Sequence, residues 1–184
     1  MSDGGRRHRW RAPLLLVAAM VLWLIIISAL SGFAGVAGGA TLPVQPLGQG
    51  VTVAPAGGWE SAQNVWKVGQ GAISLQRSGA LVAFAADAYT GNTQQLLDDQ
   101  LTSIKQQFGR FSSLPVAQTT LANGRPALKV LFSGTSDSSD LDGELVAVAT
   151  GQTGVVMMAV ASTGQLSRVQ GDLDQMLDSL VIPK

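Results

Sequence analysis

Side chains able to carry chemistry are few in this chain of 184 residues. It has no cysteine and one histidine, His8, which lies in a basic cluster near the amino terminus. Everything after residue 40 therefore lacks both thiol and imidazole, which excludes cysteine nucleophiles, Ser-His-Asp triads and histidine-based zinc sites there. The phosphate-cradling patterns GxxxxGKS, GxxxxGKT and GxGxxG are also missing from the sequence. We expect no catalytic residue and no cofactor.

Carboxylates are the remaining candidates for catalysis. Hydrolysis by a carboxylate pair requires two acids about 5–10 Å apart across a cleft. The available acids are Glu60, Asp87, Asp98 and Asp99. Their spacing gives no reason for any two to converge, so a carboxylate-based hydrolase is only an alternative to a domain without enzymatic activity.

One acidic cluster is the candidate metal site. Its acidic members are Asp137, Asp140, Asp142 and Glu144. Residues 138, 140, 142 and 143 match the first, third, fifth and sixth positions of a calcium-binding loop, where alternating oxygens and a glycine turn suit a hard cation. The twelfth position is Ala149 instead of glutamate, and the flanking residues have the pattern of strands. The sequence therefore favours a polar hairpin tip over a metal site.

A membrane span is predicted near the amino terminus. The cytoplasmic flank contains Arg6, Arg7, Arg9, Trp10 and Arg11. An uncharged, mostly apolar run follows from Pro13 to Ala40, longer than the roughly 20 residues that cross a bilayer as a helix. Because basic residues stay on the cytoplasmic side, the sequence predicts a single-pass protein of the cell membrane with its carboxyl-terminal domain outside. The alternative is a signal peptide cleaved after Gly38-Gly39-Ala40.

The chain divides into four predicted segments. Residues 1–11 form a cytoplasmic basic tail, 12–36 a transmembrane helix, 37–50 a Gly/Pro-rich linker, and 51–184 an extracytoplasmic domain. Four of the 12 basic residues lie in the tail, leaving eight, and one of the 12 acidic residues, Asp3, lies there, leaving eleven. The mildly negative remainder is unsuited to a phosphate backbone, so nucleic acid is not an expected partner. Its composition is typical of a bacterial exported domain.

Seven short strands are predicted after the linker. They cover residues 51–53, 72–76, 80–86, 116–121, 126–133, 144–150 and 155–161. Asn123-Gly124 between two of them is a strong hairpin signal. The strands at 80–86 and 155–161 are apolar on both faces, so each side of the sheet must be covered.

Two amphipathic helices are predicted to provide that cover. Asn92 and Gln95 form a capping box before an apolar stripe that runs from Leu97 to Phe108, and Gly109 is expected to end this helix. Ser162 and Gln165 form a second such box. The stripe that follows contains Leu166, Val169, Leu173, Met176, Leu177 and Leu180. The predicted fold is α+β, an antiparallel sheet of about seven strands with helices on both faces.

The order of these elements resembles the PsbP/Mog-like family. The likeness covers Val51 to Ile182 and is carried by Pro55-x-x-x-Trp59, by Asn123-Gly124-Arg125-Pro126 and by the closing Leu177-Asp-Ser-Leu180. That resemblance implies an α/β/α sandwich that binds or supports other proteins without catalysis. It also implies bacterial relatives that are often lipoproteins or single-pass membrane proteins of undetermined role. This chain lacks the cysteine to which a lipid anchor is attached.

Trp59 and Trp66 are the candidate interaction residues, because tryptophan is favoured at binding hot spots. Burial at the edge of the core is the alternative for both. The expected function is binding of a protein partner in the cell envelope. A carrier or sensor of a small apolar ligand is the second possibility, because small side chains could leave room beside the sheet. These are Ala83, Ala85, Ala147, Ala149 and Ala159.

Overall fold

A computed structural model describes residues 42–62, 71–136 and 139–183 of the chain. The predicted cytoplasmic tail and membrane span, together with Trp66 and Asp137, lie outside these ranges. Within them, neither helix has both the length and the apolar character needed to cross a bilayer.

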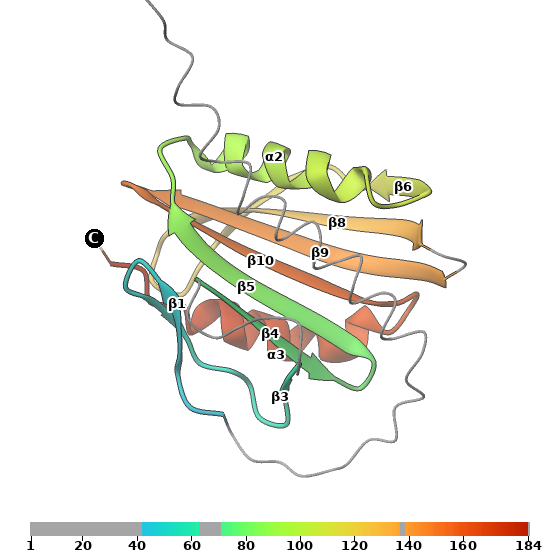
Figure 1. Ribbon diagram of the computed structural model, residues 1–184, viewed down its shortest axis with the longest axis horizontal. Coiled ribbons are helices and arrows are strands. Elements are labelled where there is room, and N and C mark those ends of the chain that lie inside the picture. Colours follow the sequence, from blue (N-terminus) through green and yellow to red (C-terminus); the bar gives the residue numbers. More distant parts are fainter. Residues whose placement is uncertain (1–41, 63–70, 137–138, 184) are drawn as a thin grey trace, which may run out of the picture.

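An eight-stranded antiparallel sheet forms the centre of the described structure (Figure 1). In spatial order its strands are β3 (Glu60–Ser61), β4 (Ala72–Arg77), β5 (Ala80–Ala88), β10 (Thr153–Ser162), β9 (Ser139–Thr150), β8 (Pro126–Ser136) and β6 (Arg110–Ser113), with β7 (Ala117–Thr120) also paired to β8. The two strands predicted to be apolar on both faces, β5 and β10, are direct neighbours within the sheet. The hairpin predicted at Asn123-Gly124 joins β7 to β8, and Gly124 has the positive φ of 78° that such a turn requires.

One helix packs on each face of this sheet, which confirms the predicted layer arrangement. Helix α2 (Thr93–Lys105) packs on β9 and β8, and helix α3 (Leu166–Asp178) packs on β10 and β5. In Figure 1, α2 lies above the sheet and α3 below it. Two separate apolar cores result, one on each face. Because α2 packs mainly on β9 and β8 and α3 on β10 and β5, each helix covers only part of its own face.

The helix ends differ in part from the sequence-based expectation. The capping box of α2 is confirmed, since Asn92 Oδ1 accepts from the Gln95 amide and Gln95 Oε1 accepts from the Asn92 amide. This helix ends at Lys105, before Gly109, whose amide instead donates to Thr135 O as the chain turns into β6. The second predicted box is wrong: Gln165 caps α3 without any side-chain hydrogen bond. The apolar stripe of α3 is buried throughout, as predicted.

A small separate hairpin precedes the main sheet. It joins β1 (Gln45–Gly48) to β2 (Val51–Val53), and Thr52 of β2 bonds through both backbone groups to Val181 near the carboxyl terminus. Leu47 is fully buried in the core on the α3 side. The folded domain thus begins within the segment predicted to be a linker, at Gln45 or before.

Candidate interaction surface

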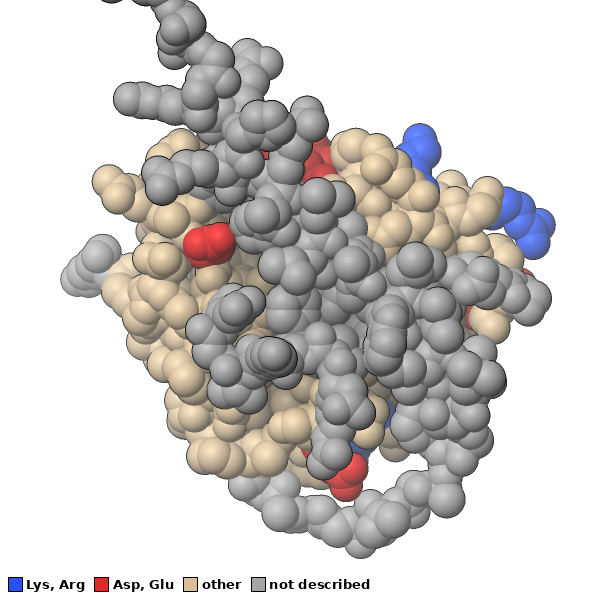
Figure 2. All heavy atoms as spheres, in the orientation of Figure 1, with Lys and Arg blue, Asp and Glu red and all other residues tan. Residues whose placement is uncertain are grey.

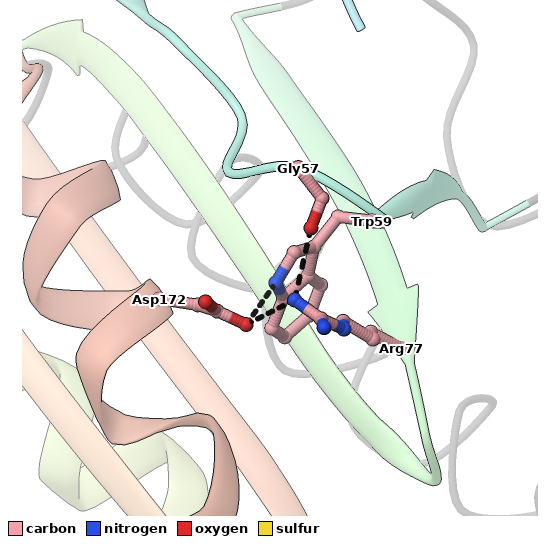
Figure 3. Close-up of polar contacts among 4 residues, drawn as sticks. All are labelled: Gly57, Trp59, Arg77 and Asp172. Carbon is pink, nitrogen blue, oxygen red and sulfur yellow. Dashed lines mark hydrogen bonds and ion pairs between the residues drawn. The ribbon is translucent and has the colours of Figure 1, made fainter. Parts of the chain in front are cut away.

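Trp59 is a core residue in the structure and not an exposed recognition residue. Its side chain is 1% exposed, and its indole Nε1 donates to Asp172 Oδ2 at 3.0 Å (Figure 3). The same carboxylate oxygen lies 2.6 Å from Arg77 Nη1, which also donates to Gly57 O at 2.9 Å. Trp59 therefore fastens the segment before β3 to α3, and its surface is not available to a partner.

The described members of the acidic cluster lie at alternating positions along β9 and are engaged separately. Asp140 accepts from the Thr135 hydroxyl, Asp142 accepts from the Gly164 amide, and Glu144 is fully buried. In the described ranges, no three residues among His, Cys, Asp and Glu come together in a way that could hold a metal ion. The strand is longer than predicted, so the cluster lies mainly within β9 and not in a hairpin tip.

The four carboxylates considered for catalysis are all exposed and lie on three elements. Glu60 is in the edge strand β3, and Asp87 is near the end of β5. Asp98 and Asp99 lie on α2, over the opposite half of the sheet. Their placement gives no support to the hydrolase alternative.

The small side chains of β9 allow α2 to pack closely. Ala147 is fully buried in the core beneath α2, and the Ala149 amide donates to Thr93 Oγ1 in the first turn of that helix. Ala159 belongs to the core on the other face. Ala83 and Ala85 pair with Met158 and Val156 of the α2-side core, so four of the five alanines share that face and only Ala159 lies on the other.

On the face opposite α2, helix α3 packs on β10 and β5, so among the described residues the outer strands β8 and β6 have no helix packed along them, and α3 approaches β8 at Lys129. Leu114 follows β6 directly, and its amide donates to Leu131 O at 2.9 Å, so the two residues are cross-strand neighbours. Their side chains share the α3 side of the sheet, because Leu131 pairs with Glu144 of β9, which contacts α3. Leu114 is 60% exposed and Leu131 is 37% exposed.

Hydroxyl and basic side chains continue this surface along the strands. Ser112 pairs with Ser133, and Arg110 pairs with Thr135, on the same side of the sheet as the leucines. We call the set Arg110, Ser112, Leu114, Leu131 and Ser133 the open sheet face. Val116, also 40% exposed, lies just beyond Leu114 in the break between β6 and β7. A contiguous exposed apolar patch rimmed by polar residues is a feature of protein interaction sites.

An ionic network separates the open sheet face from α3. Lys129 Nζ lies 2.9 Å from Glu144 Oε1 as an ion pair, while Glu144 Oε2 accepts from Gln170 Nε2 at 3.0 Å. Asp174 of α3 lies 3.9 Å from the same ammonium group. Both oxygens of the buried carboxylate thus face a polar group, which is the condition for keeping such a group in a core.

Sequence reasoning missed the residues of this surface. The alternation of the strand at 126–133 places Leu128, Val130 and Phe132 on one face, which leaves Leu131 on the other face with Lys129. That alternation was the available signal for Leu131. For Leu114 there was none, because its pairing partner is remote in the chain.

Charged side chains form no visible basic patch on the face of the molecule shown in Figure 2. Where the described residues are visible there, the blue and red side chains lie in small groups among uncharged residues.

Solved structures with the same fold were found, although no protein-family model and no curated protein matches the sequence. Cyanobacterial PsbP (CyanoP) from Synechocystis sp. PCC 6803 has a TM-score of 0.57 at 8% identity, covering 83% of this chain and 98% of that one. The Ran-binding protein Mog1p of Saccharomyces cerevisiae has a TM-score of 0.55 at 10% identity, covering 79% and 96%. A protein of unknown function from Pseudomonas aeruginosa has a TM-score of 0.51 at 15% identity, covering 79% and 99%. The order of strands and helices described above is therefore that of the PsbP/Mog1-like fold.

Proposed function

We propose that this protein is a membrane-tethered, extracytoplasmic domain without catalytic activity that binds a protein partner in the cell envelope through the open sheet face. The single observation that carries the proposal is the exposed cross-strand pair Leu114–Leu131 on a part of the sheet that neither described helix covers. Burial of these side chains against a partner would remove apolar surface from water. This would stabilise the complex by about 25 cal/mol for each Å² of apolar surface buried.

Two further features support the binding function. The chain after residue 40 lacks cysteine, a common nucleophile, and histidine, the most frequent general base. The fold is shared with a protein whose name describes it as Ran-binding. Because folds host unrelated interactions, that likeness favours binding as a class of function and says nothing of the partner.

The tether rests on the sequence alone. The apolar run from Pro13 to Ala40 and the arginines before it predict a cytoplasmic amino terminus and an external domain. A reporter enzyme that is active only outside the cytoplasm, fused after Lys184, should be active, and intact mass of the membrane-extracted protein should include residues 1–40. A reporter active only in the cytosol would contradict the location, and a mature chain beginning near Thr41 would contradict the tether.

Photo-crosslinking in intact cells tests the binding surface. A benzophenone amino acid at position 114 should give a discrete protein adduct, and the Leu131→Asp substitution in the same chain should abolish it. Val181 is a matched control, since it is 61% exposed and lies away from the open sheet face beside β2. The proposal fails if position 181 gives the same adduct, or if the adduct at position 114 survives Leu131→Asp.

A further inference from the structure

We infer that the partner binds as an added strand along the outer edge of β6, and that its segment carries an acidic residue four positions after an apolar one. This inference rests on the proposed function and specifies its mode and the chemistry of the partner.

The outer edge of β6 has backbone groups that no described strand uses. β6 ends the order of the main sheet, and in the described part of the chain it pairs only with β8. Hydrogen-bonded and non-hydrogen-bonded pairs alternate along an antiparallel ladder. Since Leu114 is bonded to Leu131, residues Ser112 and Arg110 also bond to β8. The N–H and C=O groups of Phe111 and Ser113 must then point away from β8, toward the free edge.

Free edge groups of this kind are the template for strand addition by an extended segment. Arg110, Ser112 and Ser113 are exposed, and no described strand pairs with the outer edge of β6. The residue after Leu114 is Pro115, which has no backbone N–H and therefore cannot donate a hydrogen bond to an added strand. The site of addition is therefore short, from Arg110 to Leu114.

The side chains along this edge define what the added strand must carry. Residues opposite Arg110, Ser112 and Leu114 would occupy non-hydrogen-bonded pairs, in which side chains approach most closely. An apolar residue opposite Leu114 would extend the row of Leu114 and Leu131 by one member. In the part of the chain that the structure describes, Arg110 has no ion pair, so a carboxylate opposite it supplies the complementary charge.

Every strand pair in this sheet is antiparallel, so we expect the partner strand to be antiparallel to β6 as well. Its residues then face Leu114, Ser112 and Arg110 in that order along its own chain. The probe is therefore the blocked peptide Thr-Leu-Thr-Ser-Thr-Asp-Thr, with its leucine opposite Leu114 and its aspartate opposite Arg110. A second peptide carries lysine in place of aspartate. A third carries N-methyl groups on the two threonines that face Ser113 and Phe111, which removes the hydrogen bonds that the peptide donates to β6 and sterically blocks close approach of its backbone, without changing the side chains.

The full chain in nanodiscs is titrated with each peptide, and exchange of individual amide protons is followed by NMR. The aspartate peptide should slow exchange of the Phe111 and Ser113 amides by about tenfold or more, as expected for amides that enter a ladder. The N-methylated peptide should give no protection. Arg110→Glu should reverse the preference, so that the lysine peptide protects and the aspartate peptide does not. Arg168→Glu is the control for charge alone, because Arg168 is exposed on α3, and it should leave the preference unchanged.

The edge mode is overturned if the methylated and unmethylated peptides protect equally, or if Arg110→Glu leaves the charge preference as it was. Such a result together with a persisting adduct at position 114 removes strand addition and leaves binding by the open sheet face in place. Loss of both the adduct and the protection removes the proposed function as well.

Discussion

The indole Nε1 of Trp59 and the carboxylate of Asp172 meet at 3.0 Å across 113 residues of sequence, and this contact joins the start of the domain to its last helix. Figure 3 shows the two side chains with Arg77, whose Nη1 reaches the same carboxylate oxygen. Because Trp59 is buried while Arg77 and Asp172 are partly exposed, substitutions at these two partners should change the free energy of unfolding by different amounts.

Asp172→Ala should lower the free energy of unfolding by about 1–3 kcal/mol, because it leaves a buried indole N–H without an acceptor. Arg77→Ala should lower it by less than about 1 kcal/mol, since the arginine side chain is 38% exposed and its ion pair is screened by water. Urea unfolding followed by circular dichroism measures both. Asp99→Ala, on the exposed side of α2, is the control and should change little. Equal losses for Asp172→Ala and Arg77→Ala would contradict the importance of the indole bond.

Lys129→Met should be more damaging than the double substitution Lys129→Met with Glu144→Leu. The single change leaves the fully buried Glu144 carboxylate without its counter-ion, which costs about 3–5 kcal/mol, whereas removal of both charges restores an apolar contact. A double-mutant cycle from urea unfolding gives the comparison. If the double variant is as unstable as the single one, the pair is not the reason for the loss.

Two glycine-to-alanine substitutions should act in opposite directions. A Cβ at Gly143 would clash with the ring of Phe132, its cross-strand neighbour, which packs against Phe108 and Phe111, so Gly143→Ala should destabilise by about 1–3 kcal/mol. At Gly171 in α3 a Cβ would meet no atom within 4 Å, so Gly171→Ala should stabilise by up to about 1 kcal/mol. Melting temperatures of the two variants check this, and a change of the same sign in both would refute it.

Tyr89 should titrate above the ordinary range of tyrosine. Burial raises the pKa of its phenol first, and the negative charges of Asp99 and then Asp98 raise this pKa further. It is the only tyrosine in the chain, so absorbance of tyrosinate reports this group alone. The midpoint should lie above pH 10 in the folded protein and return to about 10 in concentrated urea.

The raised pKa of Tyr89 also determines how the stability of the protein depends on pH. A raised pKa in the folded state means that the neutral phenol is favoured by folding. The corresponding stability is complete below about pH 10 and is lost as the pH rises through the folded-state pKa. Tyr89→Phe should flatten this alkaline loss of melting temperature. An unchanged alkaline slope in the variant would count against Tyr89 as its source.

Calcium should leave the melting temperature unchanged. In the described structure Asp140 is bonded to Thr135, Asp142 to the Gly164 amide, and Glu144 to Lys129 and Gln170, so a cation would have to displace several contacts. Thermal unfolding with and without millimolar calcium tests this. A rise in melting temperature that saturates with calcium would restore the metal-site interpretation.

The sequence by itself determined the elements whose signals are local. The capping box of Asn92 and Gln95 satisfies its bonds within four residues, and the Asn123-Gly124 turn does the same, so both could be read without knowledge of the fold. The two-sided apolar character of β5 and β10 likewise predicted that helices cover both faces of the sheet.

Only the tertiary structure decided the surface on which the proposed function depends. β6 is short and mostly exposed, so no apolar periodicity marks it, and its register with β8 joins Arg110 to Thr135. β1 has a single fully buried residue, Leu47, within a segment of linker-like composition. The role of Trp59 depends on Asp172, and the exposure of Leu114 depends on where α3 stops covering the sheet. These features all depend on contacts between segments that are far apart in the chain. The local sequence of one segment does not show which other segment it will contact, so the sequence alone could not predict them.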